Sequence, residues 1–179
     1  MESVALTYAK ALFSLSLEES KDKKILDELN VIYLSCESDD SFIKLLDNRN
    51  ITKESKKEII ASVFDHKVDK TLLSFLKLLI DKSRAYALKD ICKEYKKEYY
   101  NHYNIKEAKV YSALSISDSK IADLKKNLEE KYNSEFIIET YIDESLVGGI
   151  KVVIGDQVID GSISSKLRRM KNDIILNTN

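Results

Sequence analysis

The chain contains no proline and no tryptophan, and its four glycines lie at positions 148, 149, 155 and 161. Proline and glycine are the residues that most often interrupt a helix. Their absence from everything before Gly148 therefore favours helices joined by short connections. The same scarcity makes each glycine of the last third a candidate for a turn or for a close approach of two backbone segments.

Cysteine and histidine are also scarce, with two residues of each type. Cys36 and Cys92 fall on the apolar faces of expected helices, where a free cysteine behaves as a small hydrophobe. We therefore interpret both as buried thiols of a protein in a reducing compartment. His66 and His102 have no cysteine or second histidine at ligand spacing, so we expect no metal site.

Neither sign of charge predominates, because 29 basic residues are matched by 30 acidic ones and both halves of the chain are close to neutral. The chain therefore lacks the basic excess that is typical of a nucleic-acid binder, and it has no acidic interaction tail. No stretch approaches the roughly 18 consecutive apolar residues that cross a bilayer. The N-terminal residues resemble neither a secretory signal nor a mitochondrial presequence. We expect a cytoplasmic protein without direct membrane insertion.

Sequence signatures of catalysis are missing as well. There is no G-x-x-x-x-G-K-[ST] loop for nucleotide phosphates. Gly161-Ser162-Ile163-Ser164 is not a G-x-S-x-G turn with a base in reach. Adjacent acids such as Asp143 and Glu144 are typical of solvated turns. We therefore expect no enzymatic activity, no cofactor and no small-molecule substrate.

Amphipathic segments, by contrast, are abundant. Before residue 104, apolar residues recur with the 3.6-residue period of a helix in six stretches, separated by polar clusters. Thr52 is an expected helix N-cap. Six short helices with brief connections form a compact bundle. We expect these helices over residues 3–17, 22–36, 41–47, 53–64, 69–82 and 86–103.

Beyond residue 104 the apolar period changes. Ala108, Val110, Leu114 and Ile116 alternate with more polar neighbours, which indicates a half-buried strand. The remaining pattern predicts a helix over 118–132, strands over 135–142 and 146–154, a strand fragment over 157–159 and a closing helix over 162–176. We thus expect an α+β, mostly helical fold, with an N-terminal six-helix bundle over 1–104 and a small β-α-β-β-α domain over 105–179.

The four glycines are assigned structural roles in this scheme. Gly148 and Gly149 fall inside the expected strand 146–154, where a glycine pair marks a bulge or close packing. Gly155 begins a tight turn between two strands. Gly161 precedes the last helix, which we expect Ser162 to cap.

Two of the expected helices have more apolar surface than a bundle requires. A bundle helix needs an apolar stripe a little wider than 100°, whereas the apolar residues of helix 69–82 spread over roughly 220°. Helix 3–17 likewise has one apolar face with Tyr8 and Leu12 and another with Leu6 and Phe13. Two interpretations remain open: both helices are buried on all sides, or their outer faces form a groove for a partner helix.

Three motifs, taken in order, resemble one family. They are Thr7-Tyr-Ala-Lys-Ala-Leu-Phe13, then Leu78-Leu-Ile-Asp-Lys-Ser-Arg84 followed by Leu88, and finally the glycine-bearing segment 146–170. This arrangement is similar to the delta subunit of the F-type ATP synthase, whose mitochondrial relative is the oligomycin-sensitivity-conferring protein. The resemblance implies a non-catalytic stator subunit of the peripheral stalk. Such a subunit serves ATP synthesis and hydrogen ion transport by linking the catalytic head to the membrane-anchored stalk, on the cytoplasmic face of the membrane.

The resemblance also implies where partners bind. In delta subunits a groove between the first and fifth helices holds the N-terminal helix of the alpha subunit, and the C-terminal domain grips the ends of the b subunits. By motif position, the expected groove comprises Tyr8, Lys10, Leu12, Phe75, Leu78, Leu79 and Lys82. Arg84 is expected to order the following turn through carbonyl or carboxylate contacts. The expected b-binding surface comprises Val152, Ile163, Leu167, Arg168, Arg169 and Met170. Lys82-Ser83 replaces the Asn-Gly or Lys-Gly of many relatives, which implies a less sharp helix end.

Two other functions are compatible with the residues alone. The β-α-β-β-α pattern, with Tyr111 and Tyr141 on a sheet, allows an RNA- or ribosome-associated protein, although neither a GXXG loop nor a basic stripe accompanies it. A helical adaptor for some other amphipathic segment needs the same groove. Salt distinguishes the first alternative, because nucleic-acid binding weakens steeply as salt rises and an apolar contact does not.

Overall fold

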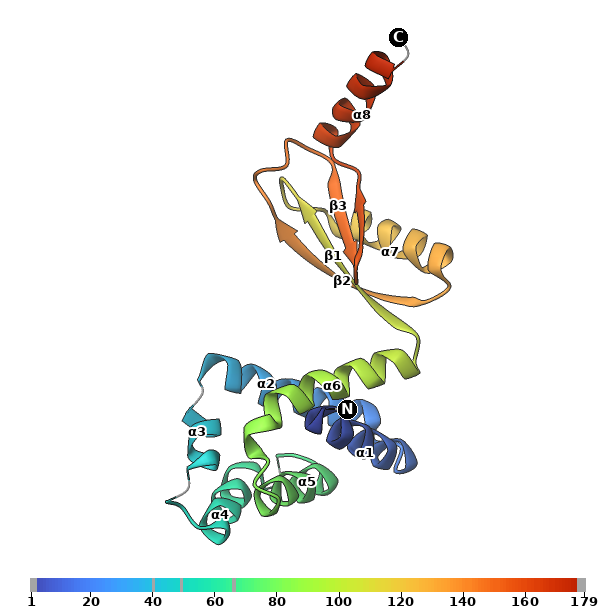
Figure 1. Cartoon of the computed structure of the whole chain (residues 1–179). Coiled ribbons are helices and arrows are strands. Elements are labelled where there is room, and N and C mark those ends of the chain that lie inside the picture. Colours follow the sequence, from blue (N-terminus) through green and yellow to red (C-terminus); the bar gives the residue numbers. More distant parts are fainter. Residues whose placement is uncertain (1–2, 40, 49, 66, 177–179) are drawn as a thin grey trace. The chain divides into compact units, whose positions relative to one another are not determined.

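The computed structural model describes residues 3–39, 41–48, 50–65 and 67–176. The chain divides between His102 and Tyr103 into two units, which we call unit 1 and unit 2. Unit 1 is helical, and unit 2 contains a mixed sheet with helices (Figure 1). The α+β, mostly helical class expected from the sequence is therefore confirmed.

The described part of unit 1 contains six α-helices and one short 3-10 helix. The helix bounds fall within two residues of those expected, except that the last expected helix begins as the 3-10 turn η1. The elements are α1 (Val4–Glu18), α2 (Asp22–Ser38), α3 (Ser41–Asp47), α4 (Lys53–Phe64), α5 (Lys70–Asp81), η1 (Ala85–Ala87) and α6 (Leu88–His102).

Side-chain caps explain where two of these helices begin. Thr52 Oγ1 accepts the N–H of Ser55 at 3.2 Å, as expected for the N-cap of α4. Asp69 Oδ1 accepts the N–H of Thr71 at 3.0 Å and caps α5. Each cap satisfies a first-turn N–H group that has no acceptor inside its own helix.

Serine takes the place of glycine at two helix ends. Ser20 and Ser83 have φ values of 55° and 54°, in the left-handed region. After α5, the N–H of Ser83 bonds to Ile80 O at 2.9 Å and the N–H of Arg84 bonds to Leu79 O at 2.8 Å. These two bonds make a complete Schellman motif. The less sharp helix end expected at Ser83 is therefore wrong, because the backbone of Ser83 adopts the left-handed conformation that usually favours glycine.

The core of unit 1 lies where α1 and α6 pack together. Tyr95 of α6 is fully buried, and its hydroxyl lies 2.7 Å from Ser16 Oγ and 3.0 Å from the carbonyl oxygen of Asp22. One phenol therefore connects α6 to both α1 and α2. Cys36 and Cys92 are buried and are not joined to each other by a disulfide, as expected. Burial raises the pKa of Cys92 to about 12.

Unit 2 is built on a four-stranded sheet in the order β2-β1-β3-β4. Strand β1 runs parallel to β2, to which α7 connects it, and antiparallel to β3. Strands β3 and β4 form a hairpin around Gly155, whose φ is 54°. The elements are β1 (Ile105–Ser112), α7 (Asp118–Tyr132), β2 (Glu135–Ile142), β3 (Ile150–Ile154), β4 (Gln157–Asp160) and α8 (Ile163–Leu176).

Helix α7 covers one face of the sheet (Figure 1). The core between them is apolar, because Val110 and Phe136 of the sheet are fully buried and Leu128 of α7 is 5% exposed. Alternation along β1 places Tyr111 and Lys109 on the opposite face. Unit 2 thus buries one side of its sheet and leaves the other side accessible.

Two strand predictions need correction. The expected continuation of β1 through Leu114 and Ile116 is wrong, because β1 ends at Ser112 and Leu114 is 78% exposed. The strand expected from residue 146 begins only at Ile150, so Gly148 and Gly149 precede it. Residues 146–149 are apolar or glycine and therefore looked like the start of the strand, but they belong to the loop that precedes β3.

Candidate functional site

A shallow hollow of about 380 Å³ lies between α1 and α5 of unit 1, and we call it the α1–α5 groove. Leu15 of α1 and Leu78 of α5 line it and remain 44% and 42% exposed. Phe75 lies between them and is almost buried. The ring of Tyr8 meets Phe75 edge-on, with centroids 6.3 Å apart. The groove therefore offers an apolar floor that is open to a partner.

The expected groove residues divide into three groups. Phe75 and Leu78 line the hollow, and Tyr8 lies outside the lining but contacts Phe75. Leu12 and Leu79 do not form a contact surface, because each is 1% exposed and belongs to the core. Lys10 and Lys82 are exposed but lie outside the lining of the hollow.

Sequence reasoning missed five residues that line the groove: Leu15, Glu19, Lys70, Thr71 and Ser74. Two of them could have been found from helical spacing. Leu15 lies seven residues, or about two turns, after Tyr8, and Ser74 lies four residues before Leu78. Glu19 and Thr71 gave no such signal, because a charged and a polar residue at a helix end are typical of solvent-exposed positions.

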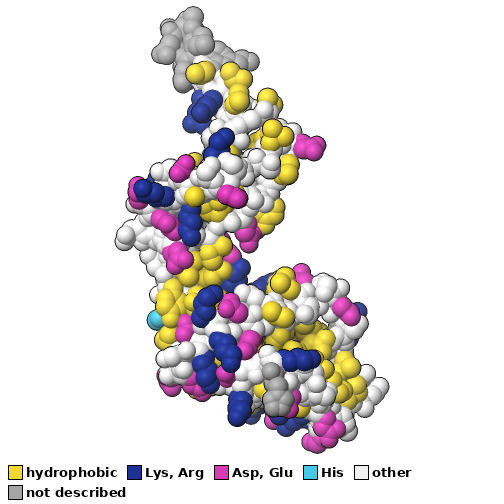
Figure 2. Space-filling model, turned by 180° about the vertical axis from the view of Figure 1, so that it is seen from behind, with side chains coloured by type: hydrophobic (Ala, Val, Ile, Leu, Met, Phe, Trp, Pro, Cys, Tyr) yellow, Lys and Arg dark blue, Asp and Glu magenta, His cyan; other side chains and the backbone are white. Residues whose placement is uncertain are grey.

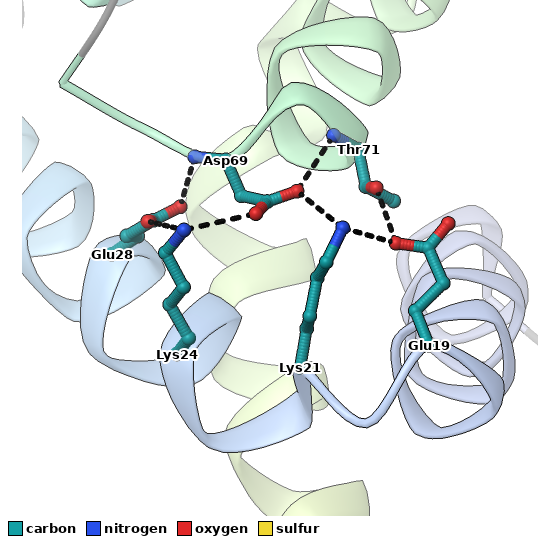
Figure 3. Close-up of polar contacts among 6 residues, drawn as sticks. All are labelled: Glu19, Lys21, Lys24, Glu28, Asp69 and Thr71. Carbon is teal, nitrogen blue, oxygen red and sulfur yellow. Dashed lines mark hydrogen bonds and ion pairs between the residues drawn. The ribbon is translucent and has the colours of Figure 1, made fainter.

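Glu19 and Thr71 also belong to a polar cluster of six residues, Glu19, Lys21, Lys24, Glu28, Asp69 and Thr71 (Figure 3). Asp69 is its centre. The Asp69 carboxylate lies 3.2 Å from the ammonium of Lys21 and 2.9 Å from that of Lys24. The backbone N–H of Asp69 donates to Glu28 at 2.8 Å. The start of α2 is thereby attached to the start of α5.

Glu19 extends this cluster to the end of α1. Its carboxylate accepts from the ammonium of Lys21 and from the hydroxyl of Thr71, both at 2.7 Å. Three segments, the end of α1, the start of α2 and the start of α5, therefore meet at one end of the α1–α5 groove (Figure 3). The cluster defines the separation of the two groove helices at that end.

Neighbouring charges and hydrogen bonds keep the side chains of Asp69, Glu19 and Lys21 ionised. The N–H of Thr71 and the ammonium groups of Lys24 and Lys21 hold the pKa of Asp69 well below its usual range. The ammonium of Lys21 lowers the pKa of Glu19, and Glu19 in turn raises the pKa of Lys21. Because Asp69 is buried, its charge is screened less by solvent than that of a surface ion pair.

Arg84 orders the turn after α5 in a different way from the one expected. Its guanidinium donates to the hydroxyl of Tyr86 at 2.7 Å, and Arg84 Cζ lies 6.0 Å from the centre of the Tyr86 ring. The contact is thus with a phenol, not with a carbonyl or carboxylate. The backbone N–H of Arg84 contributes separately, by completing the end of α5.

A second accessible apolar surface lies on α8 of unit 2. Ile163, Leu167 and Met170 are 47%, 61% and 62% exposed and follow the i, i+4, i+7 spacing of one helix face. Figure 2 shows apolar side chains beside basic ones near the C-terminal end of the chain. Val152, which we expected on this surface, is only 3% exposed and belongs to the core of unit 2.

Hydrogen bonds at the start of α8 hold its two arginines. Arg169 donates to the carbonyl oxygen of Asp160 at 2.9 Å, and Arg168 donates to Ser165 Oγ at 3.3 Å. Ser162 caps the helix as expected, since its Oγ accepts the N–H of Ser165 at 3.3 Å. The hydroxyl of Ser165 is the main cause of the depressed pKa of Asp160. The charged groups at this end of α8 are therefore ordered.

Close packing of glycines connects β3 to α8. A Cβ at Gly149, whose φ is 82°, would lie 2.5 Å from the carbonyl oxygen of Gly161. A Cβ at Gly148 would lie 2.8 Å from Ile163 Cδ1. Gly148 and Gly149 thus pack closely, although they lie before the strand in which we expected them, and they bring the loop before β3 against the first residues of α8.

The accessible face of the sheet contains the aromatic pair considered for RNA binding. The rings of Tyr111 and Tyr141 stack, with centroids 5.3 Å apart, and Lys151 lies 5.8 Å from the centre of the Tyr111 ring. The Tyr141 hydroxyl donates to Glu139 at 2.7 Å, and this bond raises the pKa of Tyr141. The carboxylate of Glu139 offsets the charge of Lys151, so the pair supplies stacking without the excess of positive charge that a phosphate backbone requires.

Among the described residues, no group of three or more His, Cys, Asp or Glu could hold a metal ion. His66, one of the two histidines considered above, lies outside the described residues. No helix in the described ranges is long and apolar enough to cross a membrane.

Comparison with known proteins decides the family. The model of the ATP synthase delta (OSCP) subunit matches residues 4–174. The chain belongs to this family. The delta subunits of Alkaliphilus oremlandii and Clostridioides difficile are 35% and 33% identical to it, over 97% and 96% of this chain and 96% and 95% of their own lengths. A chain in the cryo-EM structure of the Toxoplasma gondii mitochondrial ATP synthase hexamer has the same fold. Its TM-score is 0.69 at 15% identity, covering 97% of this chain and 98% of that one.

Membership of the delta (OSCP) family establishes the general function. The chain is a non-catalytic stator subunit of the F-type ATP synthase, the complex of ATP synthesis and proton transport. The expectations of a stator subunit and of no enzymatic activity are thus confirmed. The groove of unit 1 and the apolar face of α8 are its candidate contact surfaces within that complex.

Proposed function

We propose that the α1–α5 groove binds the amphipathic N-terminal helix of the alpha subunit, and that α8 binds the ends of the b subunits. Unit 1 then holds the catalytic head, and unit 2 holds the peripheral stalk. The protein is a peripheral component on the cytoplasmic face of the membrane. The observation that supports this proposal most directly is the pair Leu15 and Leu78, two large apolar side chains exposed on facing helices of one hollow.

The groove has the features of a helix-binding site. An amphipathic helix places apolar side chains at i, i+3, i+4 and i+7 into such a groove. Leu15, Phe75 and Leu78 supply the apolar floor, and the polar cluster around Asp69 supports one end. Lys70 is exposed at that end and is available to a carboxylate of the partner. Apolar contact supplies affinity, and charge at the end supplies orientation.

The surface on α8 is suited to binding a helix. Ile163, Leu167 and Met170 form an exposed apolar stripe, and Arg168 and Arg169 lie beside it with side chains that hydrogen bonds hold in place. Their charge complements acidic positions on a stalk helix. Ordered arginines lose little conformational freedom on binding, which lowers the entropic cost of association.

The mechanism of such a subunit is mechanical. A rotary synthase turns a shaft inside its catalytic head, and the head must be kept from turning with the shaft. Two separate interfaces, one on each unit, connect the head to a membrane-anchored stalk. This task depends on slowly dissociating contacts and requires no reactive side chain.

A copurification experiment tests the proposal. The tagged protein is recovered from gently solubilised native membranes, washed at high salt and examined by mass spectrometry. Recovery of the alpha and b subunits through the wash supports the proposal, because apolar contacts resist salt. Recovery of ribosomal proteins or RNA that the wash removes would contradict it.

Two variants assign the partners to separate surfaces. Leu78→Asp should lose the alpha subunit and retain the b subunits, whereas Leu167→Asp should lose the b subunits and retain alpha. Each side chain is substantially exposed, so we expect both variants to fold. If either variant loses both partners while its circular dichroism stays native, the assignment of one partner to each unit is wrong.

A further inference from the structure

A second hollow in unit 1, of about 600 Å³, lies among α3, α4, the end of α5 and η1, and we call it the α4 cavity. Helix α4 packs against α5, and α3 packs against η1 (Figure 1). The α4 cavity shares no lining residue with the α1–α5 groove. Its volume falls in the range of small-molecule sites. Its apolar wall includes Leu46, Ile51 and Ile80, and its polar wall includes Thr52, Lys56 and Ser83.

Lys56 is the unusual residue of this cavity. It is only 9% exposed, and its side chain forms no hydrogen bond or ion pair with any described residue. Its neighbours on α4 differ in this respect. Lys53 donates to the carbonyl oxygen of Asp81 at 2.6 Å, and Lys57 lies 2.5 Å from the Asp81 carboxylate. A buried lysine without a partner is uncommon, because burial of an unpaired charge is unfavourable.

The ammonium of Lys56 is accessible to solvent. In the part of the chain that the structure describes, no buried side-chain nitrogen or oxygen lacks a hydrogen-bond partner. Since Lys56 Nζ has no such partner, it must reach solvent, and we expect it to do so through the cavity that Lys56 lines. The aliphatic part of the side chain is therefore buried while the charge faces the hollow.

The N-terminus of α4 also favours an anion beside Lys56. Lys56 lies in the first helical turn, and helical side chains lean toward the N-terminus. The ammonium is thus directed to the end of α4 where first-turn N–H groups lack intrahelical acceptors and the helix dipole is positive. Thr52 Oγ1 accepts the N–H of Ser55, so the N–H groups of Lys53 and Glu54 are the ones that the helix and its cap leave available.

Acidic residues at the same place restrict the kind of anion. Asp47 lines the cavity, and the exposed Glu54 lies in the first turn of α4. Lys53 also lines the cavity, but its ammonium donates to the carbonyl oxygen of Asp81. Both carboxylates repel a doubly charged phosphate more strongly than they repel a monocarboxylate, which can contact Lys56. The apolar wall favours a ligand with a hydrocarbon portion.

We propose that the α4 cavity binds a small monocarboxylate, with its carboxylate on Lys56 and the start of α4 and its hydrocarbon portion against Leu46, Ile51 and Ile80. This site lies outside the surfaces assigned to the alpha and b subunits. The inference therefore does not depend on the proposed function.

Titration of the full chain, followed by 1H-15N NMR spectra, tests this site. The probes are hexanoate, its neutral counterpart hexanamide, and inorganic phosphate. Hexanoate should shift the amide signals of Lys53, Glu54 and Ser83, and it should bind at least tenfold more tightly than hexanamide or phosphate. A charged hydrogen bond is typically strong enough for a tenfold effect.

Two neighbouring lysines provide the variant and its control. Lys56→Gln should weaken hexanoate at least tenfold, whereas Lys57→Gln should change it less than twofold, because Lys57 contacts Asp81 instead. Equal binding of hexanamide, tighter binding of phosphate or an unaffected Lys56→Gln variant would overturn the proposal. If the variant does not fold, the comparison of hexanoate with hexanamide on the unaltered chain decides the question.

Discussion

Replacement of Leu78 by aspartate tests whether the α1–α5 groove binds an apolar helix. Leu78 is 42% exposed, so the fold already covers more than half of the side chain and a partner can cover only the remainder. Full burial of a leucine is worth about 2 kcal/mol. The partner therefore gains roughly 0.8 kcal/mol at this position, or about fourfold in affinity. Leu78→Ala should weaken binding by no more than that.

Aspartate has a larger effect because it places a carboxylate against an apolar helix. Burying an unpaired polar group costs about 1–3 kcal/mol, and a charged group costs more, so we expect at least this additional loss of binding free energy. Added to the lost apolar contact, this amounts to at least about 2 kcal/mol, or roughly 30-fold in affinity. The same change removes about 1.2 kcal/mol of burial within the fold, which a domain of ordinary stability tolerates.

Fluorescence anisotropy with a labelled peptide of the alpha N-terminal segment measures this difference, and circular dichroism monitors the fold. Leu34→Asp is the control, because Leu34 is a 66% exposed leucine on α2, outside the lining of the groove. It should change peptide affinity less than twofold. The reasoning is refuted if Leu78→Asp binds the peptide normally while folded, or if both variants weaken binding equally. Unfolding of Leu78→Asp alone would show that Leu78 stabilises the core.

Three further predictions concern stability and reactivity. Asp69→Asn retains a helix cap but loses its charge between two lysines, so urea unfolding at pH 7 should be easier by about 1 kcal/mol. The pKa of Asp69 is depressed by folding, so its contribution is complete above the unfolded value near 4 and lost as pH falls below it. Between pH 5 and pH 2, Asp69→Asn should therefore lose less stability than the unaltered protein. Gly149→Ala should lower the melting temperature more than Gly155→Ala, because both have positive φ but only Gly149 has backbone atoms within 3 Å of the added Cβ. Cys92, with its pKa raised to about 12, should resist iodoacetamide at pH 8 until the chain unfolds, as mass spectrometry would show.

The helices and strands were largely predictable because their signals are local. Thr52 is a polar cap before an amphipathic segment, and the structure starts α4 directly after it. The closing helix likewise begins next to Ser162. The failures also have local causes. Leu114 continued an apolar alternation past the last residue that β1 pairs with its neighbours. Gly149 required a left-handed φ, which removed it from the strand.

The candidate sites were less predictable, because their composition depends on contacts between distant segments. The six residues of the cluster around Asp69 come from two distant segments, yet in sequence they are ordinary charged and polar residues near helix ends. The surroundings of Lys56 also depend on contacts between distant segments. Its position in a run of lysines suggests a solvated face, and only the packing of α3, α4 and α5 places it in a cavity.

The sequence by itself determined the family, the two-part α+β organisation and the two helices with surplus apolar surface, because periodicity, caps and motif order are local properties of the chain. Only the tertiary structure decided which side chains of those helices are accessible. Leu78 and Leu79 are adjacent and chemically identical, yet one is 42% exposed and the other 1%. Successive positions on a helix point about 100° apart, and the neighbours packed on each side determine whether a leucine becomes part of the core or part of the groove.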